Sequence, residues 1–278
     1  MKNLINKKIL LVICGGIAAY KSLELIRILK KNKCQVKTIL TKGSLEFITP
    51  LSVSSLSNEK VYTDLFDFKN EAEMDHISLS RWSDAIVFAP ATANKIAQLS
   101  NGLAEDLATT VALASDKVIF LAPAMNVRMW DNLITKNNLK KLINSNYEII
   151  GPDIGEMACG EYGSGKLSDP IEISSVINNY FKNLEENKKF KALVTAGPTR
   201  EYIDPVRYIS NESSGKQGYE IALALNKLGI ETTLIIGPSN LISQKKIKTK
   251  KIVTADEMFA EVKKSLPVDI AVCSAAVS

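Results

Sequence analysis

Short apolar runs alternate with stretches of helical periodicity over the first two thirds of the chain. Apolar residues recur at helical spacing in the stretches 17–31 and 93–114. Buried strands that alternate with helices predict an α/β fold, a doubly wound parallel sheet of flavodoxin-like or Rossmann-like type. The runs with the length and continuous apolar character of buried strands are 9–16, 36–41, 84–90, 117–123 and 147–152.

The same alternation restarts after a polar segment at 182–190 that is rich in lysine and glutamate. Three strands and two helices form only part of a nucleotide-binding α/β domain, so we predict a second, incomplete Rossmann-like domain. The expected boundaries are a first domain over 1–184, a linker over 185–190 and the second domain over 191–278. Its strands are expected at 192–199, 232–238 and 269–277, and its helices at 213–230 and 256–266.

Composition agrees with a globular protein of two domains: 46% of the 278 residues are apolar and 23% are charged. No apolar run approaches the ~18 residues of a membrane span, and the first one ends in Gly-Gly without a cleavage site. The net charge is +5, and its densest cluster, KKIKTKK at 245–251, lacks interleaved aromatic residues. We therefore expect a solvated face or loop there, a cytoplasmic protein, and neither nucleic acid nor membrane as a partner.

The cysteines divide into two kinds. Cys14, Cys34 and Cys273 lie in or beside apolar strand-like runs, where cysteine acts as a small hydrophobic residue. Cys159 instead lies in a polar loop rich in glycine. There is no CxxC pair and only one histidine, so no metal site is predicted.

Small and polar residues follow several predicted strands. Gly15 and Gly16 separate the first strand from a helix, where free amides and close backbone approach suit a phosphate. The fingerprint GxGxxG is absent, which disfavours a nicotinamide-dependent dehydrogenase. Thr92, Asn94 and Asn126 follow later strands and are either helix caps or the wall of a polar pocket. The neighbouring Met125, Met129 and Trp130 are expected in the core.

The segment 155–170, GEMACGEYGSGKLSDP, is expected to be a flexible loop that acts as a lid. Residues 160–167 nearly match a P-loop, but Leu167 occupies the position of the required hydroxyl residue. The segment also does not connect a strand directly to a helix, so we reject a P-loop.

His76 is the single histidine of the chain, and its role stays open at this point. Asp75 can cap a short helix that begins here, and the helix dipole would then favour a neutral imidazole suited to a general base. A structural or surface histidine is the alternative. In the second domain, Asn211, Ser213, Ser214 and Gly215 precede a helix, where they either cap it or form an anion site with Lys216.

Five motifs in the first domain resemble one family when they are taken together and in order. They are GGIAAYK, DHISLSRW, APATANK, PAMNVRMW and ACGEYGSGKL. The chain resembles the flavin-dependent cysteine decarboxylases of coenzyme A biosynthesis. The segment 197–218 resembles the start of phosphopantothenate–cysteine ligase, which is fused behind the decarboxylase in the bacterial bifunctional proteins.

This resemblance implies FMN as the cofactor, a homo-oligomer based on trimers, and 4'-phosphopantothenoylcysteine as the substrate. In the implied reaction the cysteine moiety is oxidised to a thioaldehyde, CO2 leaves, and the resulting enethiol is reduced to 4'-phosphopantetheine. His76 matches the base, Asn126 the residue that grips the substrate carboxylate, and Cys159 the proton donor on a closing loop. The implied flavin contacts are Gly15, Gly16, Ser44, Thr92, Asn94 and Met125.

For the second domain the resemblance implies activation of phosphopantothenate by CTP with Mg²⁺. Asn211 matches a residue tied to the acyl-cytidylate, and the other implied ligase residues are Ser213, Ser214, Gly215, Lys216, Ala275 and Ala276. The later segments of the ligase are missing from these residues, so we expect no ligase activity from this polypeptide. Two alternatives share the flavin fold: a peptidyl-cysteine decarboxylase, disfavoured by the ligase-like half, and a non-catalytic flavin-binding regulator, disfavoured by Cys159.

Overall fold

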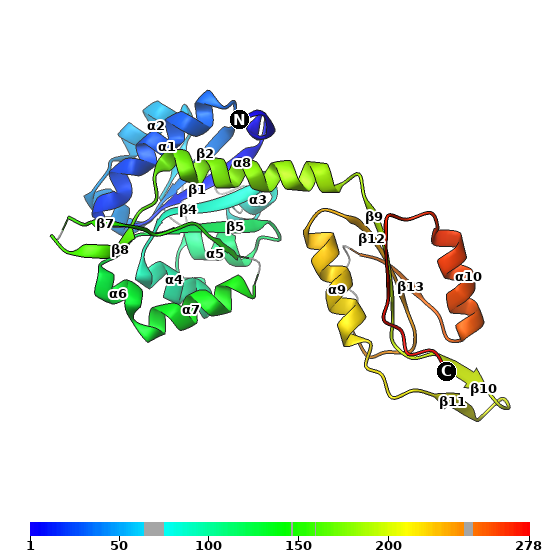
Figure 1. The fold of residues 1–278 in the computed structure, drawn as a ribbon. Coiled ribbons are helices and arrows are strands. Elements are labelled where there is room, and N and C mark those ends of the chain that lie inside the picture. Colours follow the sequence, from blue (N-terminus) through cyan, green and yellow to red (C-terminus); the bar gives the residue numbers. More distant parts are fainter. Residues whose placement is uncertain (64–74, 146, 159, 242–246) are drawn as a thin grey trace. The chain divides into compact units, whose positions relative to one another are not determined.

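The structure is a computed structural model that describes residues 1–63, 75–145, 147–158, 160–241 and 247–278. The chain divides into two compact units, Met1–Asn179 and Tyr180–Ser278. Both have strands in the interior and helices on the outside (Figure 1). Helix α8 (Pro170–Asn187) continues through residues 185–187, which were expected to belong to a linker. Ion pairs such as Lys182–Glu186 stabilise a polar helix there.

Within its described residues, the first unit is built on a six-stranded parallel sheet with the order β3-β2-β1-β4-β5-β6. Without the two-residue edge strand β3, the order is that of a flavodoxin-like sheet; with it, the order is Rossmann-like. The predicted fold class is confirmed. Within this sheet, β3 is the strand that the pattern of apolar residues did not predict. The bounds are β1 (Lys8–Ile13), β2 (Gln35–Leu40), β3 (Val61–Tyr62), β4 (Ala85–Ala91), β5 (Val118–Pro123) and β6 (Tyr147–Ile149).

Helices cover both faces of this sheet, which is why β4 and β5 are buried along their whole length (Figure 1). The strand order reverses between β1 and β4, so the right-handed crossovers after these strands place their helices on opposite faces. One group contains η2 (Ile17–Ala19), α1 (Tyr20–Lys31), η3 (Lys42–Glu46) and α2 (Pro50–Ser57). The second group of helices contains α3 (Asp75–Trp82), α4 (Ala93–Ser100), α5 (Leu107–Leu113), α6 (Val127–Asp131) and α7 (Leu133–Ile143).

The helical stretch expected over 93–114 consists of two separate helices, α4 and α5. Gly102 adopts a left-handed backbone conformation with φ +66°, which ends the first helix. Asp106 then caps α5 in a capping box with Thr109. The loop between the helices brings Asp106 back beside α4.

The segment expected to be a loop over 155–170 contains an antiparallel hairpin of β7 (Asp153–Glu156) and β8 (Tyr162–Lys166). Glycine at 165 is required because a side chain there would collide with the carbonyl oxygen of Met125. The rejection of a P-loop is confirmed, since Gly165 and Lys166 belong to a strand. Cys159 lies outside the described residues.

The second unit contains, in its described part, a four-stranded parallel sheet with the order β13-β12-β9-β14. Residues 248–251 of the basic cluster form the edge strand β13, so of the two expectations for this cluster, a solvated face or a loop, the face describes these residues. Lysines suit an edge strand because they keep its free side in water. Cys273 is exposed rather than buried, since its strand is also an edge. The elements are β9 (Lys191–Ala196), β10 (Arg200–Tyr202), β11 (Tyr208–Ser210), α9 (Lys216–Lys227), β12 (Glu231–Ile236), β13 (Lys248–Lys251), α10 (Ala255–Ser265) and β14 (Ile270–Cys273).

Candidate functional site

A cavity of about 480 Å³ lies at the carboxyl ends of the strands of the first unit. We call it the strand-end cavity. It is next to the β1–β4 reversal of strand order, where ligands bind in open parallel sheets. Its lining consists of residues 14–15, 41–43, 92–95 and 124–125, together with Gln98, Asp106 and Met129.

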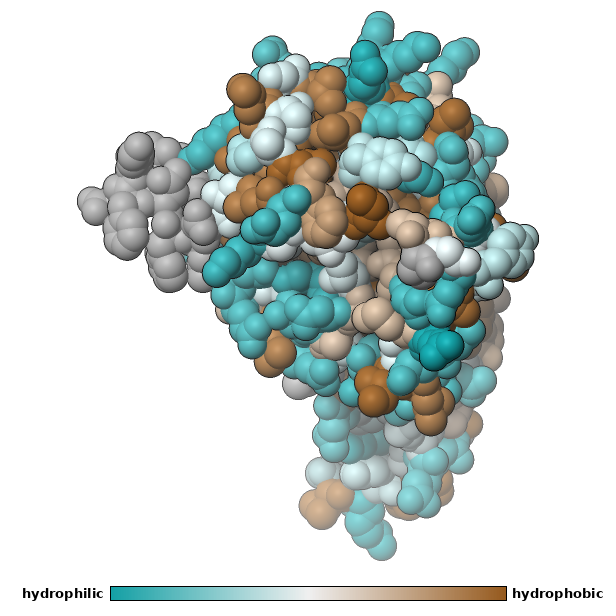
Figure 2. Space-filling model, turned by 90° about the vertical axis from the view of Figure 1, so that its left-hand side faces the viewer, coloured by the Kyte–Doolittle hydropathy of each residue, from teal (hydrophilic) through white to brown (hydrophobic). Residues whose placement is uncertain are grey.

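A second cavity of about 380 Å³ lies beside the hairpin, and we call it the hairpin cavity. It is lined by residues 16–18, 20–21, 90, 124–126, 156–158 and 165–167. Ala124 and Met125 line both cavities, which therefore adjoin. Ile17 and Tyr20 are 60% and 58% exposed at this cavity. Figure 2 shows the side of the molecule that carries α2, β7 and β8, where apolar side chains gather among polar ones.

The two neighbouring glycines, Gly15 and Gly16, have different environments. A Cβ atom at Gly15 would lie 2.6 Å from the carbonyl carbon and oxygen of Gly43, so the loops after β1 and β2 touch through their backbones. Gly16 has open space around its missing side chain and lines the hairpin cavity. The structure thus places Gly15 in the strand-end cavity and Gly16 in the adjoining one.

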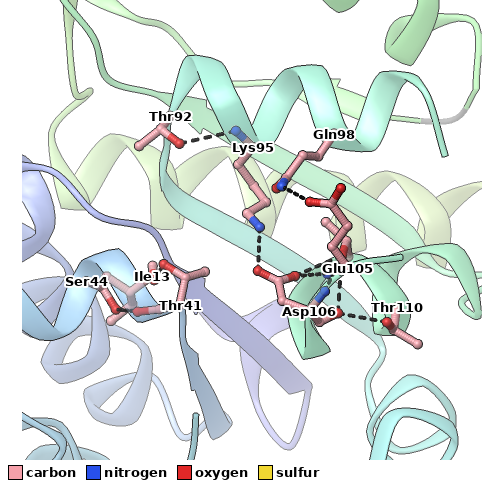
Figure 3. Close-up of polar contacts among 10 residues, drawn as sticks. Ile13, Thr41, Ser44, Thr92, Lys95, Gln98, Glu105, Asp106 and Thr110 are labelled. Atoms are coloured by element: carbon pink, nitrogen blue, oxygen red, sulfur yellow. Dashed lines mark hydrogen bonds and ion pairs between the residues drawn. The ribbon is translucent and has the colours of Figure 1, made fainter. Parts of the chain in front are cut away.

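Thr92 and Asn94 both line the strand-end cavity. Thr92 caps α4, because its Oγ1 accepts a hydrogen bond of 3.3 Å from the backbone N–H of Lys95 (Figure 3). Ser44 is buried and donates to the carbonyl oxygen of Thr41, and it is not among the residues that line this cavity. Met129, expected in the core, is 49% exposed and lines the cavity.

An ion pair between a buried lysine and a partly exposed aspartate forms part of the same wall, and the sequence patterns did not predict it. Lys95 is 5% exposed, and its Nζ lies 2.6 Å from Oδ2 of Asp106 (Figure 3). Burial raises the pKa of the Asp106 carboxyl, but hydrogen bonds from Lys95 and Thr109 outweigh it and hold the pKa below its usual value. The burial of Lys95 could have been detected in the sequence, because Lys95 lies four residues before Leu99, on the apolar face of α4.

Cys14 also lines the strand-end cavity, at the end of β1. Burial raises the pKa of its thiol to about 12. The thiol is therefore neutral at physiological pH and contributes to the cavity wall as a small apolar group.

Asn126 lines the hairpin cavity at the start of α6. Its Oδ1 caps the helix by accepting from the backbone N–H of Arg128 at 2.8 Å. Its Nδ2 donates to the carboxylate of Glu161 in the hairpin, and Glu161 also lies 3.6 Å from Nε of Arg128. Glu161 is a second residue that the sequence patterns did not single out.

His76 is half-buried on α3, which packs against α5. It is not among the described residues that line the two cavities. Cys159 and the side chain of Asp75 lie outside the described part of the chain. The structure therefore brings together four predicted residues in the strand-end cavity: Gly15, Thr92, Asn94 and Met125. Asn126 lines the adjoining hairpin cavity, which shares Met125 with the first. His76 lines neither cavity.

In the second unit, Asn211 lies against the C-terminal segment. Its Nδ2 donates to the carbonyl oxygen of Val277 at 3.1 Å and to Oγ of Ser278 at 3.3 Å. The backbone N–H of Ala276 in that segment donates to Gly197, so the ends of β9 and β14 are adjacent. Ala275 packs against a core cluster on this sheet.

The residues before α9 form a local cap. Gly215 has φ +72° and lies against the backbone of Gly197, where a Cβ atom would be 3.0 Å from its Cα. Oγ of Ser213 accepts from the N–H of Gly215, and Oγ of Ser214 accepts from the N–H of Lys216. The capping alternative for the serines therefore has direct contacts. Two cavities of about 280 Å³ each on this unit are lined by other residues, one of them with Arg200 and Lys251 and the other with Lys191 and Glu231.

The described residues contain no group of three or more His, Cys, Asp or Glu side chains placed to hold a metal ion. None of the helices in the same part of the chain combines the length and apolar character needed to span a membrane.

Comparisons with known proteins agree with the motifs. The chain is 46% identical over 254 residues to the coenzyme A biosynthesis bifunctional protein CoaBC of Haemophilus influenzae, covering 91% of this chain and 64% of the relative. It is 42% identical over 264 residues to CoaBC of Escherichia coli, covering 95% of this chain and 65% of the relative. The chain thus spans less than two thirds of the length of these relatives.

Solved structures match the first part of the chain. A cysteine-to-serine mutant of PPC decarboxylase complexed with pantothenoylaminoethenethiol has a TM-score of 0.59 and 32% identity over 64% of this chain and 99% of that one. The FMN binding protein AtHal3 has a TM-score of 0.58 and 32% identity over 64% and 97%. Peptidyl-cysteine decarboxylase EpiD has a TM-score of 0.54 and 25% identity over 62% and 99%.

Two family models cover nearly the whole sequence. The second, the DNA/pantothenate metabolism flavoprotein C-terminal domain, matches residues 187–278. The first, Flavoprotein, matches residues 1–182, which is more than half of the chain. With the motifs, the parallel sheet and these matches in agreement, the chain belongs to the Flavoprotein family, and its resemblance to the bifunctional coenzyme A biosynthesis proteins is confirmed.

Proposed function

We propose that the first unit binds FMN in the strand-end cavity and decarboxylates 4'-phosphopantothenoylcysteine to 4'-phosphopantetheine. The observation that carries this proposal is the adjoining pair of cavities. Met125 lies between the strand-end cavity, whose polar residues suit a cofactor, and the hairpin cavity, where Asn126 presents its side-chain amide. The similarity to CoaBC and to PPC decarboxylase supports the choice of substrate.

The residues present in the strand-end cavity fit FMN. Its charged lining residues are Lys42, Lys95 and Asp106, two positive and one negative, which leaves one net positive charge for a phosphate. The backbone contact between Gly15 and Gly43 keeps side chains out of this corner, and Thr92 and Asn94 offer polar groups. When bound, FMN supplies the two-electron oxidation of the substrate and the return of those electrons.

The side chains of the chain itself would hold the substrate and move its protons. Asn126 is proposed to donate its amide N–H to the substrate carboxylate, keeping that group in place until CO2 leaves. His76 is proposed as the base and Cys159 as the acid that protonates the enethiol. A cysteine-to-serine mutant of PPC decarboxylase was solved complexed with an enethiol, which supports an acid role for a cysteine.

We also propose that His76 reaches the substrate of another copy of this chain in a homo-oligomer. Its absence from the lining of the hairpin cavity supports this assignment, as do the exposed side chains of Ile17, Tyr20 and Leu51. Mixing two inactive variants, His76→Asn and Asn126→Asp, tests it. Mixed oligomers regain activity if one site combines both residues from different copies. If one copy supplies both, the mixture stays inactive.

The decarboxylation is tested on the purified protein. An absorption spectrum shows whether FMN is bound, and mass spectrometry detects the loss of CO2 from 4'-phosphopantothenoylcysteine. A peptide that ends in cysteine serves as the second substrate. Turnover of the peptide alone would contradict the proposed substrate, and a protein that cannot take up FMN would contradict the whole assignment.

For the second unit we propose that it supplies part of a site for CTP and Mg²⁺, in the cytoplasm, without ligase activity in this polypeptide, on the basis of its family match. Asn211 beside the segment 276–278 is the feature that supports a nucleotide site. Calorimetric titration of the 278-residue polypeptide with CTP and Mg²⁺ tests it, with Asn211→Ala as the variant expected to weaken binding. Equal binding by both would contradict the role of Asn211.

A further inference from the structure

We propose that the buried ammonium group of Lys95 donates a hydrogen bond to FMN in the strand-end cavity and raises the reduction potential of the bound cofactor. Asp106 acts as the positioning residue that holds Lys95 in place. This inference rests on the proposed function, because it needs FMN in that cavity.

Lys95 can donate more than one hydrogen bond. A lysine ammonium has three donors, and the described residues provide one side-chain acceptor for it, Oδ2 of Asp106. Lys95 is 5% exposed and yet lines the strand-end cavity. A buried charged donor is costly unless its N–H groups find acceptors, so a ligand in this cavity that offers a carbonyl or ring nitrogen is favoured.

Both carboxylate oxygens of Asp106 accept hydrogen bonds from neighbouring residues. Its Oδ1 accepts from both the backbone N–H and the hydroxyl of Thr109, at 2.9 and 2.8 Å, and its Oδ2 accepts from Lys95. Asp106 therefore fixes the direction of Lys95 rather than binding a ligand itself. Figure 3 shows Lys95 and Asp106 on one side and Thr41 on the other, and all three residues line the cavity.

The charge of Lys95 sets the sign of the effect on the reduction potential. Reduced FMN carries more negative charge than oxidised FMN, so a nearby positive charge stabilises the reduced form more. The positive charge of Lys95 should raise the potential, and the negative charge of Asp106 should partly cancel it. Removing the two charges separately must then shift the potential in opposite directions.

The experiment measures the midpoint potential of the FMN-loaded full chain by equilibration with redox dyes. In Lys95→Met, the affinity for reduced FMN relative to oxidised FMN should fall about tenfold, which lowers the potential by about 30 mV for a two-electron couple. Asp106→Asn keeps the helix cap, because asparagine caps as well as aspartate, and should raise the potential. Lys136→Met removes a lysine from the exposed Lys136–Asp131 pair and should leave the potential unchanged.

The opposite signs separate an electrostatic role from a structural one. Shifts of the same sign in both variants, or no shift in either, would overturn the proposal. If Lys95→Met does not fold, Lys95→Gln removes the charge while keeping a donor, and Asp106→Asn tests the sign by itself. A wild-type protein that binds no FMN would overturn the proposed function as well, whereas bound FMN with unchanged potentials would overturn this inference alone.

Discussion

The side-chain amide of Asn126 donates a hydrogen bond to the carboxylate of Glu161, which belongs to the turn of the β7–β8 hairpin. Glu161 thus occupies the same amide that we propose for the substrate carboxylate. The Nδ2 group carries two N–H donors, but two carboxylates beside one amide repel each other, so the substrate carboxylate competes with Glu161 for this position.

This competition predicts the effect of Glu161→Gln. The variant removes the negative charge that competes with the substrate, so KM for 4'-phosphopantothenoylcysteine should fall by about three- to tenfold, which corresponds to roughly 0.7–1.4 kcal/mol, the size of one ordinary hydrogen bond. Steady-state kinetics measure it, and Glu172→Gln on the first turn of α8 is the control. A raised KM would mean that Glu161 orders the hairpin over the substrate instead.

Asn126→Asp should abolish substrate binding without unfolding α6. Aspartate caps a helix as well as asparagine does, but its charge repels the substrate carboxylate at a cost of several kcal/mol. We expect kcat/KM to fall by at least about a hundredfold. Asn132 caps α7 in the same way, with Oδ1 accepting from Ile134 at 2.9 Å, so Asn132→Asp is the matched control. Similar losses in both variants would contradict a specific role for Asn126.

Gly15→Ala should destabilise the first unit, whereas Gly16→Ala should not. The new methyl group at residue 15 would press on the backbone of Gly43, and overpacking of this kind costs about 1–3 kcal/mol. At Gly16 the space is open and φ is 172°, an extended conformation that alanine also adopts. Thermal unfolding of both variants measures the difference. Equal melting temperatures would mean that the loops after β1 and β2 separate easily.

The cysteines should differ in their reactivity toward iodoacetamide in the folded protein. Burial raises the pKa of both Cys14 and Cys34 to about 12, so at pH 8 roughly one thiol in ten thousand is ionised. The thiolate is the reactive form, and Cys273 is exposed. Mass spectrometry of the digested protein should find Cys273 alkylated and the two buried residues spared. Labelling of Cys14 at a similar rate would show that the strand-end cavity opens to the reagent.

Most strands and the type of fold were predictable from the order of residues. Continuous apolar runs such as 84–90 and 117–123 are buried on both faces, and only a parallel sheet covered by helices buries strands in that way. The position of polar residues after these strands also predicted a site at the carboxyl ends, because parallel strands all end at one edge. The motifs around Gly15, Thr92 and Asn126 are among the features that the sequence indicated by itself.

Other features depend on residues that are distant in sequence and adjacent in space. Lys95 alone is a polar residue on an amphipathic helix; it is a buried cation only because the loop through Gly102 returns Asp106 to it. Gly15 needs to be glycine because of Gly43, and Lys248–Lys251 is a strand because β12 supplies its backbone partners. Periodicity records which face of a local element is buried. It contains no information on which distant group will lie opposite, and that requires the folded chain.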